Sequence, residues 1–340
     1  LTFNFIEFST NNSNAKNFVV SNIVIEDEYN LNFNKLEVID IGFKNAFFDL
    51  SQMVLEEKDL KIILDTPIDD IKKLVENFSI KDEKFINKKY KSIMDVQFNK
   101  VKLIKFLNSK NITISLPKKL EVFLIPVLID FEKNNFNYLN NNIFVKNWEN
   151  IKKNYFQINY ILPNEDVEDY LSIKNNLRNI ESYDFNEIIK KYNTNNYIIM
   201  IILKKNNYIK FFSKINLEDK YFTLNKNFKN ININNQLDLN SMILHIKNKY
   251  EDYWKSINKM SPSSSVSLHL SVEAYNTKKS LKLEDALSNL DFVNDYRIEK
   301  FDNLEIIYKI NYGSNPKRFL KEIKEYNINI DTSSANWKIK

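Results

Sequence analysis

The stretch FNKLEVIDIGFKNAFFDLSQMV, residues 33–54, decides the fold of the first part of this chain. Its apolar residues recur at steps of three and four, which places them on one face of a helix. These residues are Leu36, Ile39, Phe43, Phe47, Leu50 and Val54. Their burial favours folding by about 10 kcal/mol before chain entropy is counted. The apolar runs Phe18 to Ile25 and Tyr90 to Phe98 are predicted strands that cover this face, so we expect a helix packed on a sheet.

Composition indicates a folded chain of two or three domains. It has 340 residues, of which 43% are hydrophobic and 14% aromatic, enough to form several cores. The absence of cysteine excludes disulfides, thiolate metal sites and cysteine nucleophiles. With 49 basic and 44 acidic residues, the net charge of +5 is too small to favour nucleic-acid binding, which stays a second alternative.

No apolar run is long enough to span a bilayer, since the strongest, Tyr197 to Leu203, has the length of a strand. The chain begins at Leu1 and not at Met, so a secretory signal could lie upstream.

Four segments follow from turn and linker signals. Residues 1–17 carry an alternating Phe3, Phe5 and Phe8 pattern and an Asn- and Ser-rich run, which predicts a linker or an edge strand. Residues 18–117 are predicted to form an α+β unit of order β-α-α-β-β-α-β, with Ile112 to Leu116 as its last strand. Ser261 to Ser265 is the clearest linker, and it separates residues 118–260 from residues 261–340.

The central segment, residues 118–260, is predicted to be an α/β domain with a mixed sheet. LEVFLIPVLI at 120–129 indicates a strand buried on both faces, in which Pro126 favours an edge or a bulge. Trp148 to Tyr155 and Leu237 to Ile257 are predicted helices, and the Asn-rich stretch Phe131 to Val145 is predicted to be irregular.

The last segment, residues 261–340, has the order β, α, β, β, α, β, which is the plan of a ferredoxin-like unit. Its strands Val293 to Phe301 and Leu304 to Tyr312 are predicted to pair as a hairpin, and Ile328 to Ile339 is the predicted last strand. The order resembles that of the first unit, so the two can be related.

Only two glycines are present, Gly42 and Gly313, so neither a Walker loop nor a dinucleotide fingerprint can be built. Gly42 lies inside the first long helix, where close packing is the expected reason for a glycine. Gly313 is expected at a turn.

Catalytic and metal-binding signatures are also missing. The two histidines, His245 and His269, would need to converge with carboxylates to bind a metal ion. The serines of Ser261 to Ser267 have no nucleophile elbow around them. We therefore predict no catalytic, cofactor-binding or metal-binding residues.

Carboxylates cluster in three places, each at the end of a predicted element. The clusters are Glu26, Asp27 and Glu28; Glu56, Glu57 and Asp59; and Glu165, Asp166, Glu168 and Asp169. An acid pair of the glycosidase kind depends on three-dimensional separation, so a carboxylate-dependent hydrolase in the central domain stays an alternative.

Several segments are similar to a proteobacterial family of unknown function, domain of unknown function number twenty sixty-six. The similar segments include NFVVSNIVIE, KLEVIDIGFKNAFFDLSQMVL, YKSIMDVQFNKVKLIKFLNSKNI, LEVFLIPVLID, FNEIIKKYNTNNYIIMIIL and INYGSNPKRFLKEIKEYNINI. The resemblance covers most of the chain beyond Asn17 and consists of apolar patterning. The central part is also loosely similar to the N-terminal α/β domains of Tol-type envelope proteins.

The resemblance implies an exported protein, periplasmic or attached to the envelope of a Gram-negative bacterium, with no active-site residue to carry over. Together with the missing catalytic groups, it predicts a non-catalytic protein that binds another envelope protein or the cell wall. The sheet edges and the loop Phe131 to Val145 are the expected binding surfaces.

Overall fold

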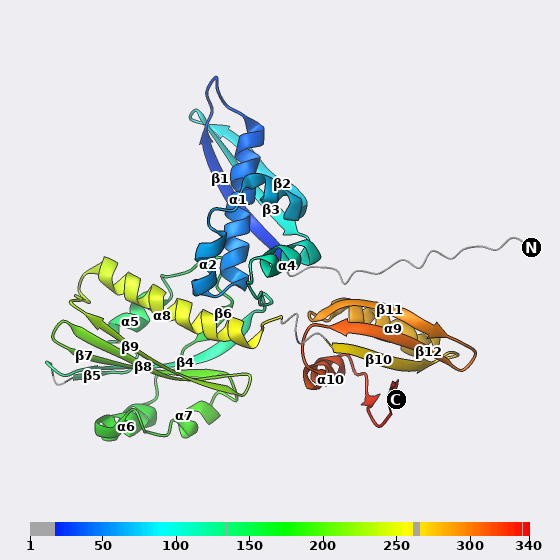
Figure 1. Ribbon diagram of the computed structural model, residues 1–340. Helices are drawn as coiled ribbons and strands as arrows, with labels where there is room; N and C mark the ends of the chain where they lie inside the picture. The colour runs from blue at the N-terminus through cyan, green and yellow to red at the C-terminus, as the bar shows by residue number, and fades with distance from the viewer. Residues whose placement is uncertain (1–17, 134, 140, 261–265, 335) are drawn as a thin grey trace, which may run out of the picture. The chain divides into compact units, whose positions relative to one another are not determined.

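The computed structural model describes residues 18–133, 135–139, 141–260, 266–334 and 336–340, so the linkers predicted at 1–17 and 261–265 lie outside the described residues. Within the described part the protein has three sheets and is a mixed α+β protein, as predicted (Figure 1). The chain divides into two compact units. One takes the described residues up to Leu50, Ile62–Leu116 and those from Lys259 onward, and the other takes Ser51–Lys61 and Pro117–Asn258. The division into four predicted segments stays a prediction.

The first sheet is three-stranded and antiparallel, in the order β1-β3-β2. The elements of this stretch are β1 (Val19–Glu28), α1 (Lys35–Val54), α2 (Glu57–Ile63), α3 (Ile68–Leu74), β2 (Val75–Ile86), β3 (Lys89–Phe98) and α4 (Lys100–Ser109). The β2–β3 hairpin turns at Asn87 and Lys88, whose φ angles are +52° and +60°. Two successive residues with positive φ match the right-handed twist of the flanking strands.

The buried face of α1 is rotated from the predicted one. Phe43, Phe47, Leu50 and Val54 are buried as predicted, but Leu36 is 71% exposed. Val38 and Ala46 are buried as well. The buried face of the helix therefore includes positions that lie beside the predicted row. The prediction for Leu36 is wrong because the pattern did not show which of two overlapping rows faces the strands.

Residues Ile112 to Leu116 do not form the predicted last strand. They pair with other described residues only through an isolated bridge between Ser115 and Lys259. Ile112, Ile114 and Leu116 are nevertheless buried. An alternating apolar pattern indicates which side chains are buried, but a strand also needs a neighbouring strand to bond to. This segment is buried without one, so the prediction of a strand is wrong.

The second sheet holds six strands, in the order β5-β4-β7-β8-β9 with β6 also paired to β4. The elements are β4 (Leu120–Asp130), β5 (Asn135–Asn137), α5 (Ile143–Trp148), β6 (Ile158–Ile161), α6 (Val167–Asn175), a 3-10 turn (Leu177–Asn179), α7 (Asn186–Lys190), β7 (Tyr197–Lys205), β8 (Tyr208–Leu217), β9 (Lys220–Lys229) and α8 (Gln236–Ile257). β4 is parallel to β6 and β7, whereas the other pairings are antiparallel. The sheet is therefore mixed, as predicted.

Helices cover both faces of this sheet (Figure 1). α5 and α8 pack on one face over Val122, Leu124 and their neighbours. α6 and α7 pack on the other face over Phe123 and Ile125. β4 is thus buried on both faces, as its apolar run predicts.

Pro126 lies in β4 where that strand is paired on one side only. It lies opposite Met200 of β7. On its other side, β6 pairs with Leu120 to Phe123 and β5 with Leu128 to Asp130. A proline has no N–H to donate, so it fits at this local edge.

The predicted helix Trp148 to Tyr155 is wrong. α5 ends at Trp148, and the segment that follows it is irregular up to β6. Asn142 begins α5 instead, because its side chain accepts a hydrogen bond from Phe144 N at 3.0 Å. The predicted irregular stretch Phe131 to Val145 therefore contains both β5 and the start of α5.

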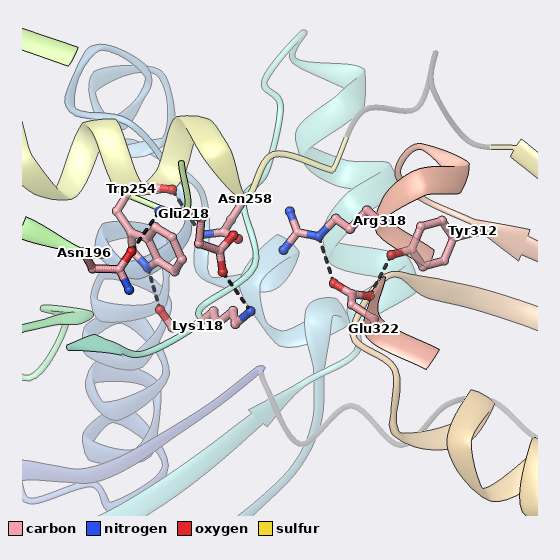
Figure 2. A network of polar contacts seen from close by, with 8 residues as sticks. All are labelled: Lys118, Asn196, Glu218, Trp254, Asn258, Tyr312, Arg318 and Glu322. Carbon is pink, nitrogen blue, oxygen red and sulfur yellow. Dashed lines mark hydrogen bonds and ion pairs between the residues drawn. The ribbon is translucent and has the colours of Figure 1, made fainter. Parts of the chain in front are cut away.

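Polar contacts at the C-terminal end of α8 tie it to the start of β4 (Figure 2). Trp254 donates its indole N–H to the Lys118 carbonyl at 2.6 Å, and Asn258 closes the helix through the Trp254 carbonyl. The Lys118 ammonium lies 3.3 Å from the Glu218 carboxylate. The Trp254 indole is therefore both buried and hydrogen-bonded, which is how a tryptophan is accommodated in a core.

The third sheet has the strand order β11-β12-β10-β14-β13. Its elements are β10 (Val266–Glu273), α9 (Thr277–Asn289), β11 (Val293–Phe301), β12 (Glu305–Tyr312), α10 (Pro316–Glu325), β13 (Ile330–Asp331) and β14 (Trp337–Ile339). The β11–β12 hairpin is confirmed. The single last strand is wrong, because two short strands, β13 and β14, stand in its place. The ferredoxin-like designation stays a prediction. Among the helices of the described residues, none is long and apolar enough to cross a membrane.

Candidate functional site

The first carboxylate cluster lies on the solvent-facing side of β1. Glu26 is within 2.5 Å of the Lys89 ammonium and 2.7 Å of the Lys91 ammonium. Hydrogen bonds from Lys89 and then Lys91 lower the pKa of Glu26 to about 2. Exposed ion pairs of this kind contribute little to stability, and a carboxylate with a pKa this low is ionised at neutral pH, so it is not a general acid.

A stripe of charged side chains lies on the buried side of α8. Lys247, Glu251 and Lys255, spaced four residues apart, are between 3% and 6% exposed. Such groups are tolerated in a core only when they are hydrogen-bonded. Each of the three side chains is hydrogen-bonded to backbone groups at the ends of helices and strands or in loops.

The partners of this stripe come from three separate segments. Glu251 accepts the backbone N–H groups of Gln157 and Ile158 at 3.0 and 2.9 Å. Lys247 donates to the carbonyls of Trp148 and Ile151 at 2.7 and 2.9 Å. Lys255 donates to the Leu55 carbonyl at 2.8 Å. The stripe therefore fastens the loop 149–157 and the residues after α1 to α8.

The second carboxylate cluster meets this stripe. Asp252 accepts the Glu57 backbone N–H at 3.0 Å, and Lys249 pairs with the Glu57 carboxylate at 2.8 Å. The pKa of Glu57 is lowered, chiefly by its hydrogen bond with Lys249, whereas burial raises the pKa of both Glu251 and Asp252. Carboxylates with opposed pKa shifts are the pattern of an acid and base pair.

The space between these carboxylates decides against a substrate site. The cavity that Glu57, Glu251, Asp252 and Lys255 line together has a volume of about 20 Å³. Ligand sites in proteins have volumes of about 300 to 1,000 Å³, and a cavity of this size holds one water molecule. The opposed pKa values here follow from packing.

The two histidines lie in different units. His245 lies on α8 in the unit of the second sheet, edge-on to Phe228, and burial lowers its pKa. His269 lies on β10 in the other unit, 3.0 Å from the Glu299 carboxylate. Among the described residues, no three histidine, cysteine or acidic side chains are grouped to hold a metal ion.

The third carboxylate cluster opens onto a pocket of about 370 Å³ that we call the Asn-loop pocket. It is formed by β5, the loop after it, and the N-terminal end of α6. Its walls consist of Asn135, Phe136, Asn137, Tyr138, Leu139, Asn141, Glu165, Asp166, Val167 and Tyr170. The predicted binding loop and one predicted carboxylate cluster thus meet in one cavity.

Asp166 is fully engaged in this pocket. As the N-cap of α6, it accepts the backbone N–H of Glu168 at 2.8 Å, and it pairs with Lys191 at 2.7 Å. The hydrogen bond from Lys191 is the largest cause of its lowered pKa. Asp166 is therefore ionised and bound at neutral pH. Glu165 is exposed.

Behind the pocket wall, two polar atoms are buried without a hydrogen-bond partner among the described residues. They are the hydroxyl of Tyr138, a residue 5% exposed, and Oδ2 of Asp169, whose Oδ1 accepts from Lys191. Burial, followed by the charge of Asp169, raises the pKa of Tyr138, so its hydroxyl keeps its proton. Buried unpaired polar groups are uncommon in folded proteins and mark places where a ligand or water can bind.

A second cavity, the α7 groove, lies beside α7 on the same side of the second sheet. Its volume is about 580 Å³, and Tyr183, Tyr197, Lys214, Tyr221 and Phe222 are among its walls. The Lys214 ammonium is bonded to the Tyr183 carbonyl at 3.2 Å. This groove was not predicted from the sequence, because its aromatic residues come from three separate segments.

Sequence reasoning found the Asn-rich loop and the carboxylates of the pocket, but it did not join them. It also missed Tyr138, Tyr170 and the stripe on α8. The spacing of Lys247, Glu251 and Lys255 was a signal for the stripe, since charges four residues apart share one helix face. Nothing in the sequence showed that this face is buried.

No family model and no curated protein matches the chain. The resemblance described above therefore stays an expectation.

Proposed function

We propose that this protein is a non-catalytic binding protein of the cell envelope, which holds a cell-wall component or a partner protein through its central sheet unit. The observation that carries this proposal is the Asn-loop pocket. Its volume of about 370 Å³ is within the range of ligand sites, and it combines aromatic walls with a few polar groups.

The distribution of carboxylates supports binding over hydrolysis. A hydrolase needs a carboxyl group that is protonated near neutral pH beside one that is ionised, with room for the substrate. In the Asn-loop pocket, Asp166 has a lowered pKa and is bound to Lys191. The carboxylates whose pKa is raised, Glu251 and Asp252, line the cavity of about 20 Å³.

The envelope location rests on the sequence resemblance alone. Fractionation of cells that produce the tagged, full-length protein tests it. We expect the protein in the periplasmic or membrane-associated fraction. Recovery in the same fraction as a cytosolic marker enzyme would contradict the envelope location. The binding proposal would then depend on the ligand-binding test of the pocket.

Binding can be tested with residue-specific methyl labels. Leu139 and Val167 line the Asn-loop pocket, and Ile189 and Ile199 line the α7 groove, so their methyl resonances report separately on each cavity. We expect soluble cell-wall fragments or an envelope partner to shift the resonances of Leu139 and Val167. Mass spectrometry of the recovered ligand should show it uncleaved.

Two results would contradict the proposal. One is cleavage of the ligand that depends on Glu165 or Asp166, which would favour the hydrolase alternative. The other is that none of the cell-wall fragments and envelope partners shifts the methyl resonances of Leu139 and Val167, even at saturating concentration.

A further inference from the structure

The charges around the Asn-loop pocket restrict the class of ligand that it can hold. Among the described residues, the pocket is lined by two carboxylates and by no lysine or arginine. The nearby Lys191 ammonium is already paired with Asp166 and Asp169, so an anionic ligand such as a phosphate or a carboxylate would lack a counter-ion and would face the Glu165 charge.

A cationic ligand is disfavoured for a different reason, because a lysine of the protein already occupies one of the positions it would take. The Lys191 ammonium pairs with both Asp166 and Asp169 at 2.7 Å. Of the two carboxylates in the pocket lining, Glu165 is the one left to pair with a cation, and it is exposed, where an ion pair contributes little. The pocket therefore suits a neutral ligand better than a charged one.

The polar groups that remain suit hydroxyl groups. Asn141 and the amide N–H₂ of Asn137 have no hydrogen-bond partner among the described residues, and the Glu165 carboxylate has none either. An amide both donates and accepts, and a carboxylate accepts, so together they match ligand hydroxyls that do both.

The apolar wall suits the C–H face of a sugar ring. Phe136 and Tyr170 lie with their ring centres 5.1 Å apart and their planes 34° apart. Phe136 is 7% exposed and Tyr170 is 37% exposed, so Tyr170 supplies most of the accessible aromatic surface. Aromatic rings carry a negative face, which attracts the weakly positive C–H groups of a pyranose.

A peptide strand is a weaker fit to the same pocket. Peptides that add to a sheet gain affinity from a row of backbone hydrogen bonds. The strand at this place, β5, has three residues and cannot support such a row.

We infer that the Asn-loop pocket binds a neutral saccharide of one or two rings, with Tyr170 against a ring face and Asn137, Asn141 and Glu165 on its hydroxyls. This inference rests on the proposed function and names its ligand class.

A matched pair of disaccharides tests the inference on the full chain. The first probe is N,N′-diacetylchitobiose, which is neutral, and the second is chitobiose at pH 6, the same skeleton with two ammonium groups. Calorimetric titration gives the affinity, and the methyl resonances of Leu139 and Val167 give the place. We expect the neutral probe to bind at least about tenfold more tightly and to leave Ile189 and Ile199 unshifted.

Three variants sharpen the test. Tyr170→Ala should lower the affinity for the neutral probe about tenfold, because it removes the ring that packs on the sugar. Asn141→Ala should lower this affinity by a smaller factor. Tyr221→Ala, an aromatic truncation at a residue that is 74% exposed in the α7 groove, is the matched control and should leave the affinity unchanged.

Glu165→Gln separates the ligand classes. It keeps an acceptor and removes the charge, so binding of the neutral probe should change by less than about threefold, whereas binding of a cation would fall by more. Thermal unfolding of each variant shows whether it is folded; Asn141 and Tyr170 lie at the surface, so at least one of the two is expected to fold normally.

The two proposals can fail separately. The saccharide inference is wrong, and the binding function stands, if two results occur together. Chitobiose or a peptide shifts the methyl resonances of Leu139 and Val167, and the neutral sugars N,N′-diacetylchitobiose and cellobiose do not. If no probe and no envelope fraction shifts these methyl groups, both are wrong.

Discussion

Gly42 of α1 lies directly against Met94 of β3. A Cβ atom built on Gly42 would overlap the Met94 sulfur and would come within 2.5 Å of Ile25 Cδ1. Both neighbours are buried, Met94 to 1% and Ile25 to 3% exposure. The sequence prediction that close packing explains this helical glycine is therefore confirmed, and α1 can approach its sheet only where a side chain is missing.

We expect Gly42→Ala to destabilise the protein although alanine is the better helix former. The helix preference favours alanine by about 1 kcal/mol, whereas overpacking a buried contact costs about 1–3 kcal/mol. Urea unfolding should show a net loss, larger for Gly42→Val. Asn45→Ala on the exposed side of α1 is the control and should be neutral or stabilising. A stabilised Gly42→Ala variant would show that Met94 moves aside freely.

Glu251→Ala should destabilise the protein by about 2–5 kcal/mol, because the backbone N–H groups of Gln157 and Ile158 lose their acceptor inside the protein. The free energy of unfolding, again from urea titration, measures the loss. Ser241→Ala, exposed on the same helix, should change it by less than about 0.5 kcal/mol. Equal effects of the two substitutions would mean that the carboxylate anchors nothing.

The unfolding free energy should rise as the pH is raised from about 8 towards 10.5. Burial lowers the pKa of Lys247 from 10.5 to about 8. Between these values the unfolded chain holds a proton that the folded protein has released, so a higher pH favours the folded state, by on the order of 1–3 kcal/mol.

Lys247→Met tests this assignment. The aromatic rings of Trp148, Phe156 and Tyr160 surround the Lys247 ammonium at 5.0 to 5.6 Å and can accommodate a thioether. The variant should lose much of the alkaline rise. Burial also lowers the pKa of Lys100 to about 8, so part of the rise should remain. An unchanged pH profile would contradict a role for Lys247.

Asp166→Asn should lower the melting temperature at pH 7, and this effect should fade as the pH falls through the lowered pKa of Asp166. Because Lys191 and the α6 backbone lower the pKa of Asp166 from 3.8, the carboxylate stabilises the folded state above pH 3.8, and this stabilisation is lost as the pH falls through the lowered value. The asparagine can still cap the helix but cannot pair with Lys191. Asn186→Ala at the start of α7, which removes one hydrogen bond from the Asn186 amide to Asp184 at 3.1 Å, is a control without charge change.

Local sequence patterns predicted the elements whose structure depends on residues close together in the chain. The spacing in α1, the hairpin of β11 and β12, and the doubly buried β4 each follow from side-chain periodicity or turn preference, and each is found. The errors lie where packing selects among equivalent patterns. Leu36 had the spacing of a buried residue, and Ile112 to Leu116 had the alternation of a strand.

The candidate sites were predictable only in parts. The Asn-rich loop was predicted as a binding surface and Asp166 as part of a carboxylate cluster at the end of an element, and both line the Asn-loop pocket. Glu57 and Asp252 are 195 positions apart, and no local pattern joins them. Whether such a pair is a catalytic dyad or a packing contact depends on the volume between the side chains.

By itself the sequence determined that this is an α+β protein without cysteine chemistry or a glycine-rich nucleotide loop, because those properties depend on residue type and on spacing along one element. The tertiary structure alone decided which carboxylates are buried, which are already paired, and which border an open pocket. Burial and pairing set the charge and the hydrogen-bonding capacity of a side chain, and both depend on residues that are distant in the chain.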